Sequence, residues 1–205
     1  MTVPKQVDHE ARRIQIAEAL MRLASRGGLE AVSLRDVAAE AGVSMGAVQH
    51  YFKSKDEMLG FAMGHVNDRA SKRIVQRLSQ EGERPKVRVV LRTLMLEMLA
   101  LSDDSRMEFL THIAFFLRAL GAPDLAATYR EWWPQLEAWV AAELCAAQES
   151  GELPADRDPE REAEALLLIP DGLSVGLLLG HRTGEGAVAA VDYHLDRLFG
   201  ESTED

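Results

Sequence analysis

The sequence predicts an all-α protein of about nine helices, and two observations support this fold class. No segment alternates apolar and polar residues as a half-buried strand would, whereas apolar residues three and four positions apart recur throughout. Capping Ser and Asp residues precede several of these segments, and glycines end others. We therefore expect a small N-terminal domain over residues 1–55, joined by a long helix to a larger helical domain over residues 56–205.

The N-terminal domain should contain three helices. Ser33 and Ser44 can cap the second and the third, and Gly42 supplies the left-handed residue between them. The sequence Ser54-Lys55-Asp56-Glu57 has the form of a capping box and opens the long fourth helix, which spans roughly 40 Å. The expected extents of these four helices are about 8–25, 33–41, 44–52 and 54–80.

The larger domain should add five helices. Asp158-Pro159 is a good pair for the N-cap and first turn of the fourth of these. Pro134 lies inside the third and should kink it. The five helices are expected after Pro85 and over about 103–120, 123–150, 158–180 and 185–199.

Composition excludes several classes of protein. With 205 residues, 47% of them apolar and 27% charged, the chain is long enough for a sizeable core. Cys145 is the only cysteine, so an internal disulfide framework is excluded. The N-terminus has no apolar stretch of the kind that signal peptides carry, and the most apolar segment, residues 165–180, is interrupted by Pro170-Asp171-Gly172. We expect a cytoplasmic protein without a membrane partner.

Charge is spread unevenly along the chain. The total is −10, but residues 1–55 hold eight Lys or Arg and six Asp or Glu, a net charge of +2. Residues 56–205 hold fifteen against twenty-seven, a net charge of −12. An acidic total therefore leaves a polyanion partner possible if the first fifty-odd residues contact it.

Residues 33–55 have the pattern of a helix-turn-helix, since two short helices are joined by Ala-Gly-Val-Ser. Val43, Val48 and Phe52 would hold the second helix to the core. Gln49 suits bidentate contact with adenine, and His50 can donate to a base edge or a phosphate. The side chains expected to face outward on this helix are Met45, Gly46, Gln49 and His50.

Residues on either side of this helix have the reach or position to contact phosphates. They are Ser33, Ser44, Tyr51 and Lys55, with Lys53 on the same exposed face. A three-helix structural subdomain with a solvated face is the alternative. Because Gln, His, Tyr and two Lys gather here in an otherwise acidic chain, the pattern favours a double-stranded DNA partner.

The run SLRDVAAEAGVSMGAVQHYFKSKDEML, residues 33–59, resembles the DNA-binding region of TetR-family transcriptional regulators. The resemblance covers about residues 12–62. It implies a homodimer with a helix-turn-helix domain and a larger ligand-binding domain. It also implies that Ser33 and Arg35 reach the DNA backbone, and that Tyr51 and Lys55 grip phosphates. Many members carry an aromatic residue where this chain has Gln49, so their operator preference does not transfer.

Met and aromatic side chains gather on three successive predicted helices within residues 84–150. Together they exceed what a compact bundle needs, and a cavity lined by such groups is the expected form of a small-molecule site. Core packing is the alternative for each one, and His112 fits a hydrogen-bonded core histidine equally well. Glu108 and Glu137 would favour a cationic, lipophilic effector unless they face water. The candidate ligand-binding residues are Met63, Met95, Met98, His112, Phe115, Phe116, Trp132, Trp133 and Trp139.

The last two predicted helices should form a homodimer. Helix 158–180 is apolar on more faces than its own subunit can cover, and helix 185–199 carries a regular apolar stripe. Such a pair can build a four-helix interface with a second chain, as the resemblance also implies. An intramolecular hairpin is the alternative. The candidate interface residues are Leu166, Leu173, Leu177, Val188, Val191, Leu195 and Leu198.

These features predict a ligand-responsive regulator, a repressor released from a near-palindromic operator by a small apolar or aromatic effector. An all-α enzyme that uses the aromatic cavity is the first alternative, and a protein-interaction module is the second. The six histidines lack the spacing of metal ligands, and Cys145 has no recognisable nucleophile context. We therefore expect no catalytic residues, no metal and no cofactor.

Overall fold

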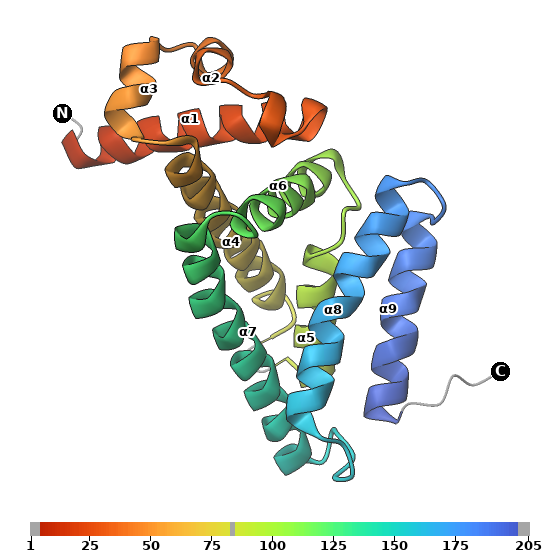
Figure 1. The fold of residues 1–205 in the computed structure, drawn as a ribbon. Coiled ribbons are helices and arrows are strands. Elements are labelled where there is room, and N and C mark those ends of the chain that lie inside the picture. The colour runs from red at the N-terminus through yellow and green to blue at the C-terminus, as the bar shows by residue number, and fades with distance from the viewer. Residues whose placement is uncertain (1–4, 83–84, 201–205) are drawn as a thin grey trace. The chain divides into compact units, whose positions relative to one another are not determined.

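The computed structural model describes residues 5–82 and 85–200, and these form nine α-helices, one short 3-10 helix and no strand (Figure 1). The all-α prediction is confirmed, and the predicted helix ends agree within a few residues. The elements are α1 (Lys5–Gly27), η1 (Leu29–Ala31), α2 (Leu34–Ala41), α3 (Met45–Tyr51), α4 (Lys55–Leu78), α5 (Val87–Glu97), α6 (Asp103–Ala119), α7 (Pro123–Ser150), α8 (Pro159–Leu178) and α9 (Gly184–Phe199).

Two compact units divide the described chain. The first, unit 1, comprises residues up to 69 together with 107–128, and the second, unit 2, comprises 70–106 together with 129 onward. Helices α4, α6 and α7 each pass from one unit into the other. The proposed boundary at residue 55, which concerns the part of the chain that binds DNA, stays a prediction.

In unit 1, α2 and α3 pack on α1 and on each other (Figure 1). The expected caps are present. The Ser33 hydroxyl accepts a hydrogen bond from the Asp36 backbone N–H, and the Asp36 carboxylate accepts one from the Ser33 backbone N–H. Gly42 adopts a left-handed conformation with φ of 65°, which L-residues with a side chain rarely adopt, and it ends α2. Ser44 then caps α3 by accepting from the backbone N–H of Ala47.

Unit 2 is built on an apolar core that α5, α7, α8 and α9 share. Its fully or almost fully buried side chains include Leu91, Met95, Leu144, Leu167 and Leu195. The Ser174 hydroxyl accepts a hydrogen bond from the backbone N–H of Ala100, so the one buried hydroxyl of α8 is satisfied.

Helix α7 continues through Pro134 as a single helix, and α8 does the same through Pro170. The kink expected at Pro134 stays a prediction. Among the helices of the described chain, none has the length and apolar character that crossing a bilayer requires.

Candidate DNA-binding surface and ligand site

The polar face of α3 is exposed as the sequence indicates. Val48 is fully buried and Phe52 almost fully, so these two side chains fix the rotation of the helix. Met45 is 42% exposed, and Gly46, Gln49 and His50 also lie on the surface. Gly46 has only the Ser44 hydroxyl within van der Waals range of an added Cβ, so nothing in the chain itself fills the space in front of this residue.

Aromatic contacts fix the C-terminal end of this surface. Tyr51 is half-buried between two histidines, with ring centroids 4.8 Å from His9 on α1 and 5.1 Å from His50. His9 did not emerge from the sequence, because it lies more than forty residues before its partner. It becomes a neighbour of the recognition helix only because α1 packs on α3.

The other predicted phosphate contacts divide into two kinds. Ser33, Arg35, Ser44 and Lys53 are exposed. Lys55 is half-buried, and its ammonium group donates to the carbonyl oxygens of Leu29 at 2.8 Å and Val32 at 3.1 Å. Two of its three donors therefore hold the segment before α2 onto α4, which is a structural role that the sequence pattern did not indicate.

The predicted ligand-binding residues fall in both units. Met63, His112, Phe115 and Phe116 belong to unit 1, and Met95, Met98, Trp132, Trp133 and Trp139 belong to unit 2. Met95 is 1% exposed within the core of unit 2, and Trp139 is 40% exposed. Met95 is thus a core residue, and Trp139 lies on the surface.

His112 is a largely buried side chain on α6. Its ring lies 4.9 Å from that of Phe116 and stacks at 6.4 Å on that of Phe109. Its Nε2 atom is buried and has no hydrogen-bond partner among the described residues, and burial lowers the pKa of His112 to about 4. The imidazole is therefore neutral near pH 7, with one polar atom unsatisfied.

The two glutamates that suggested a cationic effector differ in the structure. Glu108 is 6% exposed, and Arg69 compensates its charge across 3.5 Å. Glu137, in contrast, accepts a hydrogen bond from the indole N–H of Trp133 and leaves an oxygen for another partner. Only Glu137 has the character of an anionic group in a ligand site.

An aromatic and anionic cluster in unit 2, which we call the α7–α8 cluster, includes Glu137. The rings of Tyr129 and Trp133 stack at 5.5 Å with an angle of 19°, and Trp132 packs edge-on to Trp133 at 5.9 Å. Burial raises the pKa of Tyr129 to about 12, with further contributions from the charges of Asp171 and Glu137. Burial also raises the pKa of Asp171 on α8 above its ordinary value.

Tyr129 and Asp171 were not among the residues singled out from the sequence. A signal for them exists, because Tyr129, Trp133 and Glu137 stand four residues apart and so share one face of α7. Asp171 is a lone carboxylate inside the most apolar stretch of the chain, where removing a charged group from water is costly unless a partner compensates it.

The predicted dimer interface stays a prediction, but the structure separates its residues by burial. Leu166, Leu173, Val191, Leu195 and Leu198 are buried within their own chain, Val191 and Leu195 fully, so these side chains offer little surface to a partner. Leu177 and Val188 are half-buried. The large apolar side chains that α8 and α9 expose are instead Leu168, Val175, Leu179 at the end of α8, and Tyr193.

An exposed helix-turn-helix in unit 1 and a half-buried aromatic and anionic cluster in unit 2 are the features expected of a DNA-binding regulator with a sensor domain. Residues 16–60 match the family described as bacterial regulatory proteins, tetR family. Residues 87–200 match the family described as BetI-type transcriptional repressor, C-terminal. The chain belongs to the TetR family of transcriptional regulators.

Individual relatives agree with this assignment. The chain is 35% identical to the HTH-type transcriptional regulator PksA of Bacillus subtilis over 178 residues, which cover 86% of this chain and 83% of that protein. It is 28% identical to the HTH-type transcriptional regulator BetI of Burkholderia mallei over 201 residues, 96% of this chain and 97% of that one.

Solved structures share the fold. A transcriptional regulator from Saccharomonospora viridis in complex with choline superposes with a TM-score of 0.78 at 26% identity, covering 94% of this chain and 97% of that one. A transcriptional regulator from Rhodococcus sp. Rha1 superposes with a TM-score of 0.77 at 29% identity, covering 94% and 98%. The protein is a ligand-responsive, DNA-binding transcriptional regulator, and nothing in these likenesses favours the enzyme alternative.

Proposed function

We propose that the protein is a homodimeric repressor that binds a near-palindromic operator and is released from it by a small organic cation. The exposed face of α3 is the observation that carries the DNA-binding part. It combines Gln49 and His50, which can contact base edges, with Gly46, which lets the backbone approach the groove.

The residues flanking α3 would position it on the duplex. Ser33, Arg35, Ser44 and Lys53 are exposed and can contact phosphates, and Tyr51 is held at the edge of the same surface by His9. Because two donors of Lys55 are occupied by carbonyl oxygens, we assign the main cationic phosphate contact of this segment to Lys53 and a supporting role to Lys55.

The operator-binding proposal can be tested with Gln49→Ala. The variant should lose discrimination at one base pair by about 1–3 kcal/mol while its binding to other positions is unchanged. Selection of bound fragments from random duplex, followed by titration of single-base variants, measures this. Gln135→Ala on α7 is the control, since Gln135 is an exposed glutamine remote in sequence from the helix-turn-helix. If both variants keep the parental base preferences, Gln49 does not read the operator.

The α7–α8 cluster supports a cationic effector. Aromatic faces attract quaternary ammonium groups through their quadrupoles, and the attraction grows in a desolvated site. Asp171 and Glu137 would balance the ligand's charge, and the apolar surroundings suit its carbon groups. The choline-bound relative is consistent with this ligand class.

Choline and its neutral analogue 3,3-dimethylbutan-1-ol, which have the same shape, provide the test. Choline should quench or shift tryptophan fluorescence and release operator DNA, and the neutral analogue should bind roughly tenfold more weakly. Trp133→Leu and Asp171→Asn should each weaken the choline response, whereas Trp139→Leu, at an exposed tryptophan, should not. Equal binding of the two ligands would exclude a cation site.

Two chains would join through α8 and α9. Leu168, Val175 and Leu179 follow one another at spacings of seven and four residues, so they form a stripe along the outer face at the end of α8. A dimer of this kind can place its two recognition helices about one DNA turn apart, roughly 34–36 Å.

A further inference from the structure

The first turn of α4 carries three consecutive charged residues, and each is tied to a different part of unit 1. Lys55 holds the carbonyl oxygens of Leu29 and Val32, just before α2. Glu57 accepts from the backbone N–H of Lys53 at 2.8 Å and pairs with Arg13 of α1 at 3.3 Å. The first and third residues of this turn are therefore bound to α1, to the segment before α2 and to the end of the helix-turn-helix.

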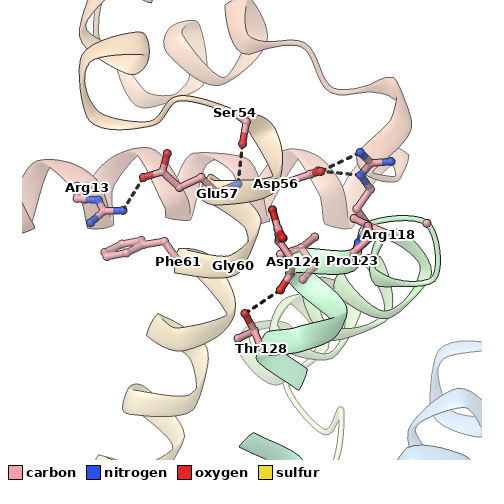
Figure 2. A pocket seen from close by; sticks show the side chains of 13 residues that line it. Arg13, Ser54, Asp56, Glu57, Gly60, Phe61, Arg118, Pro123, Asp124 and Thr128 are labelled. Carbon is pink, nitrogen blue, oxygen red and sulfur yellow. Dashed lines mark hydrogen bonds and ion pairs between the residues drawn. The ribbon is translucent and has the colours of Figure 1, made fainter. Parts of the chain in front are cut away.

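Asp56, the middle residue, instead contacts α6, outside the helix-turn-helix. Its carboxylate accepts two hydrogen bonds from the guanidinium of Arg118 on α6, at 2.7 and 2.8 Å (Figure 2). This bidentate geometry is the strongest and most directional that an arginine and a carboxylate can form. The same contact keeps the pKa of Asp56 below its ordinary value, so the pair is ionised at neutral pH.

A cavity of about 720 Å³ opens beside this pair, lined by residues of α1, α4 and the corner between α6 and α7 (Figure 2). Gly60 and Leu125 both line it, and a Cβ added to Gly60 would lie 3.4 Å from Leu125, so α4 passes close to the start of α7 one turn beyond Asp56. The ion pair thus bridges α4 and α6 at a place where side chains do not fill the surrounding space.

We propose that Arg118 and Asp56 are positioning residues for operator binding, which set the orientation of the first turn of α4 and, through Lys55 and Glu57, of the helix-turn-helix. Arg118 lies six residues after His112 on α6, so the same helix that carries a buried, unsatisfied imidazole also holds this tie. The inference rests on the proposed function, because it assumes that the exposed face of α3 binds an operator.

The test measures operator affinity without effector, on the full chain, for Arg118→Gln, Asp56→Asn, Arg118→Lys and the double variant Asp56→Asn with Arg118→Gln. Each single loss should weaken binding about three- to fivefold, since a half-exposed pair contributes modestly. The double variant should be no weaker than either single one, because both remove the same contact. Arg118→Lys should be intermediate.

Salt dependence separates positioning from direct contact. A residue that touches a phosphate lowers the slope of log affinity against log salt by about 0.9 when it is removed, whereas Arg118→Gln should leave the slope unchanged. Arg92→Gln is the matched control. Arg92 forms a bidentate pair with Asp192 in unit 2, and the side chains of the two pairs are about equally exposed, 37% and 31% against 40% and 32%.

Four outcomes would each overturn the proposal. Arg118→Gln could bind operator with parental affinity or with a salt slope reduced by about one. The losses of the two single variants could add up in the double variant, or Arg92→Gln could lose as much affinity as Arg118→Gln. The fragment used is the tightest one selected from random duplex by the parent chain. If the parent selects no fragment, the proposed function fails and this inference falls with it. A parent that selects a fragment but ignores choline leaves this test intact, so the two failures are distinguishable.

Discussion

Helices α3 and α8 expose opposite kinds of surface. In α3 the buried side is reduced to Val48, and the exposed side is polar apart from Met45. In α8 seven residues are buried, and the exposed side still carries large apolar groups such as Leu168, which is 64% exposed. A polar face gains little from leaving water unless a charged or polar partner replaces it, whereas an exposed apolar face gains from any complementary apolar surface. The two helices therefore suit different kinds of partner, which we propose to be DNA for α3 and a second chain for α8.

The largest expected effect tests this comparison within α8 itself, at two adjacent leucines. Leu167 is fully buried and Leu168 is 64% exposed. Leu167→Glu should reduce the free energy of unfolding by about 4 kcal/mol or more, because it replaces a core side chain with a carboxylate that has no partner. Leu168→Glu should leave the fold intact but convert dimers to monomers, since each chain would bring a carboxylate into the proposed apolar interface.

Thermal unfolding and sedimentation measure the two outcomes separately. Val75, also exposed and apolar but on α4, supplies the control variant Val75→Glu. Dimers that persist in Leu168→Glu would show that the outer face of α8 is not the interface. A stable, soluble Leu167→Glu would show that the core of unit 2 is less tightly packed than its burial indicates.

The contrast between α3 and α8 also shows how far the sequence could predict which side chains are buried. In α3 there is a single apolar stripe, so the buried side and hence the outward set of Gln49 and His50 could be read directly. In α8 and α9 apolar residues are in surplus, and periodicity alone cannot distinguish a leucine that faces its own core from one that faces a partner. This ambiguity is why Leu195 was predicted for the interface, although its side chain is fully buried in its own chain.

Side-chain contacts between residues far apart in the sequence could not be predicted from it either. Arg118 lies 62 residues after Asp56, and nothing in the local pattern of either helix selects the other as its partner. Lys55 shows that a predicted role can also compete with a contact within the chain. Its position after the recognition helix indicated a phosphate contact, but two carbonyl oxygens that precede α2 occupy most of its donors.

An intermediate effect is expected at His112, a polar residue on a helix that is otherwise apolar at its centre. Burial gives the folded state a pKa of about 4, whereas the unfolded chain titrates near 6.5. Between these values the unfolded state binds the proton and the folded state does not, so stability is fully present above about pH 6.5 and falls as the pH drops toward 4. The loss should reach up to about 3 kcal/mol.

Chemical unfolding at several pH values measures this loss, and His112→Leu should remove most of it. His194→Leu, at an exposed histidine on α9, should keep the parental pH profile. If the parent and His112→Leu lose stability equally over this range, the imidazole is already hydrated or hydrogen-bonded, and it is not a free polar group for a ligand.

The smallest expected effect separates the two lysines that flank the start of α4. Lys53 is exposed, and its side chain is free to reach a phosphate, so Lys53→Ala should weaken binding to all sequences and lower the salt slope by about one. Lys55→Ala should instead lower the free energy of unfolding by about 1 kcal/mol, because the Leu29 and Val32 carbonyls lose their donor. Its salt slope should stay close to that of the parent.

Titration of operator at three salt concentrations, together with thermal unfolding, distinguishes the two lysine variants. A reduced slope for Lys55→Ala with unchanged stability would return Lys55 to the DNA-binding surface, since its ammonium would then have to exchange carbonyl oxygens for phosphate when the operator binds.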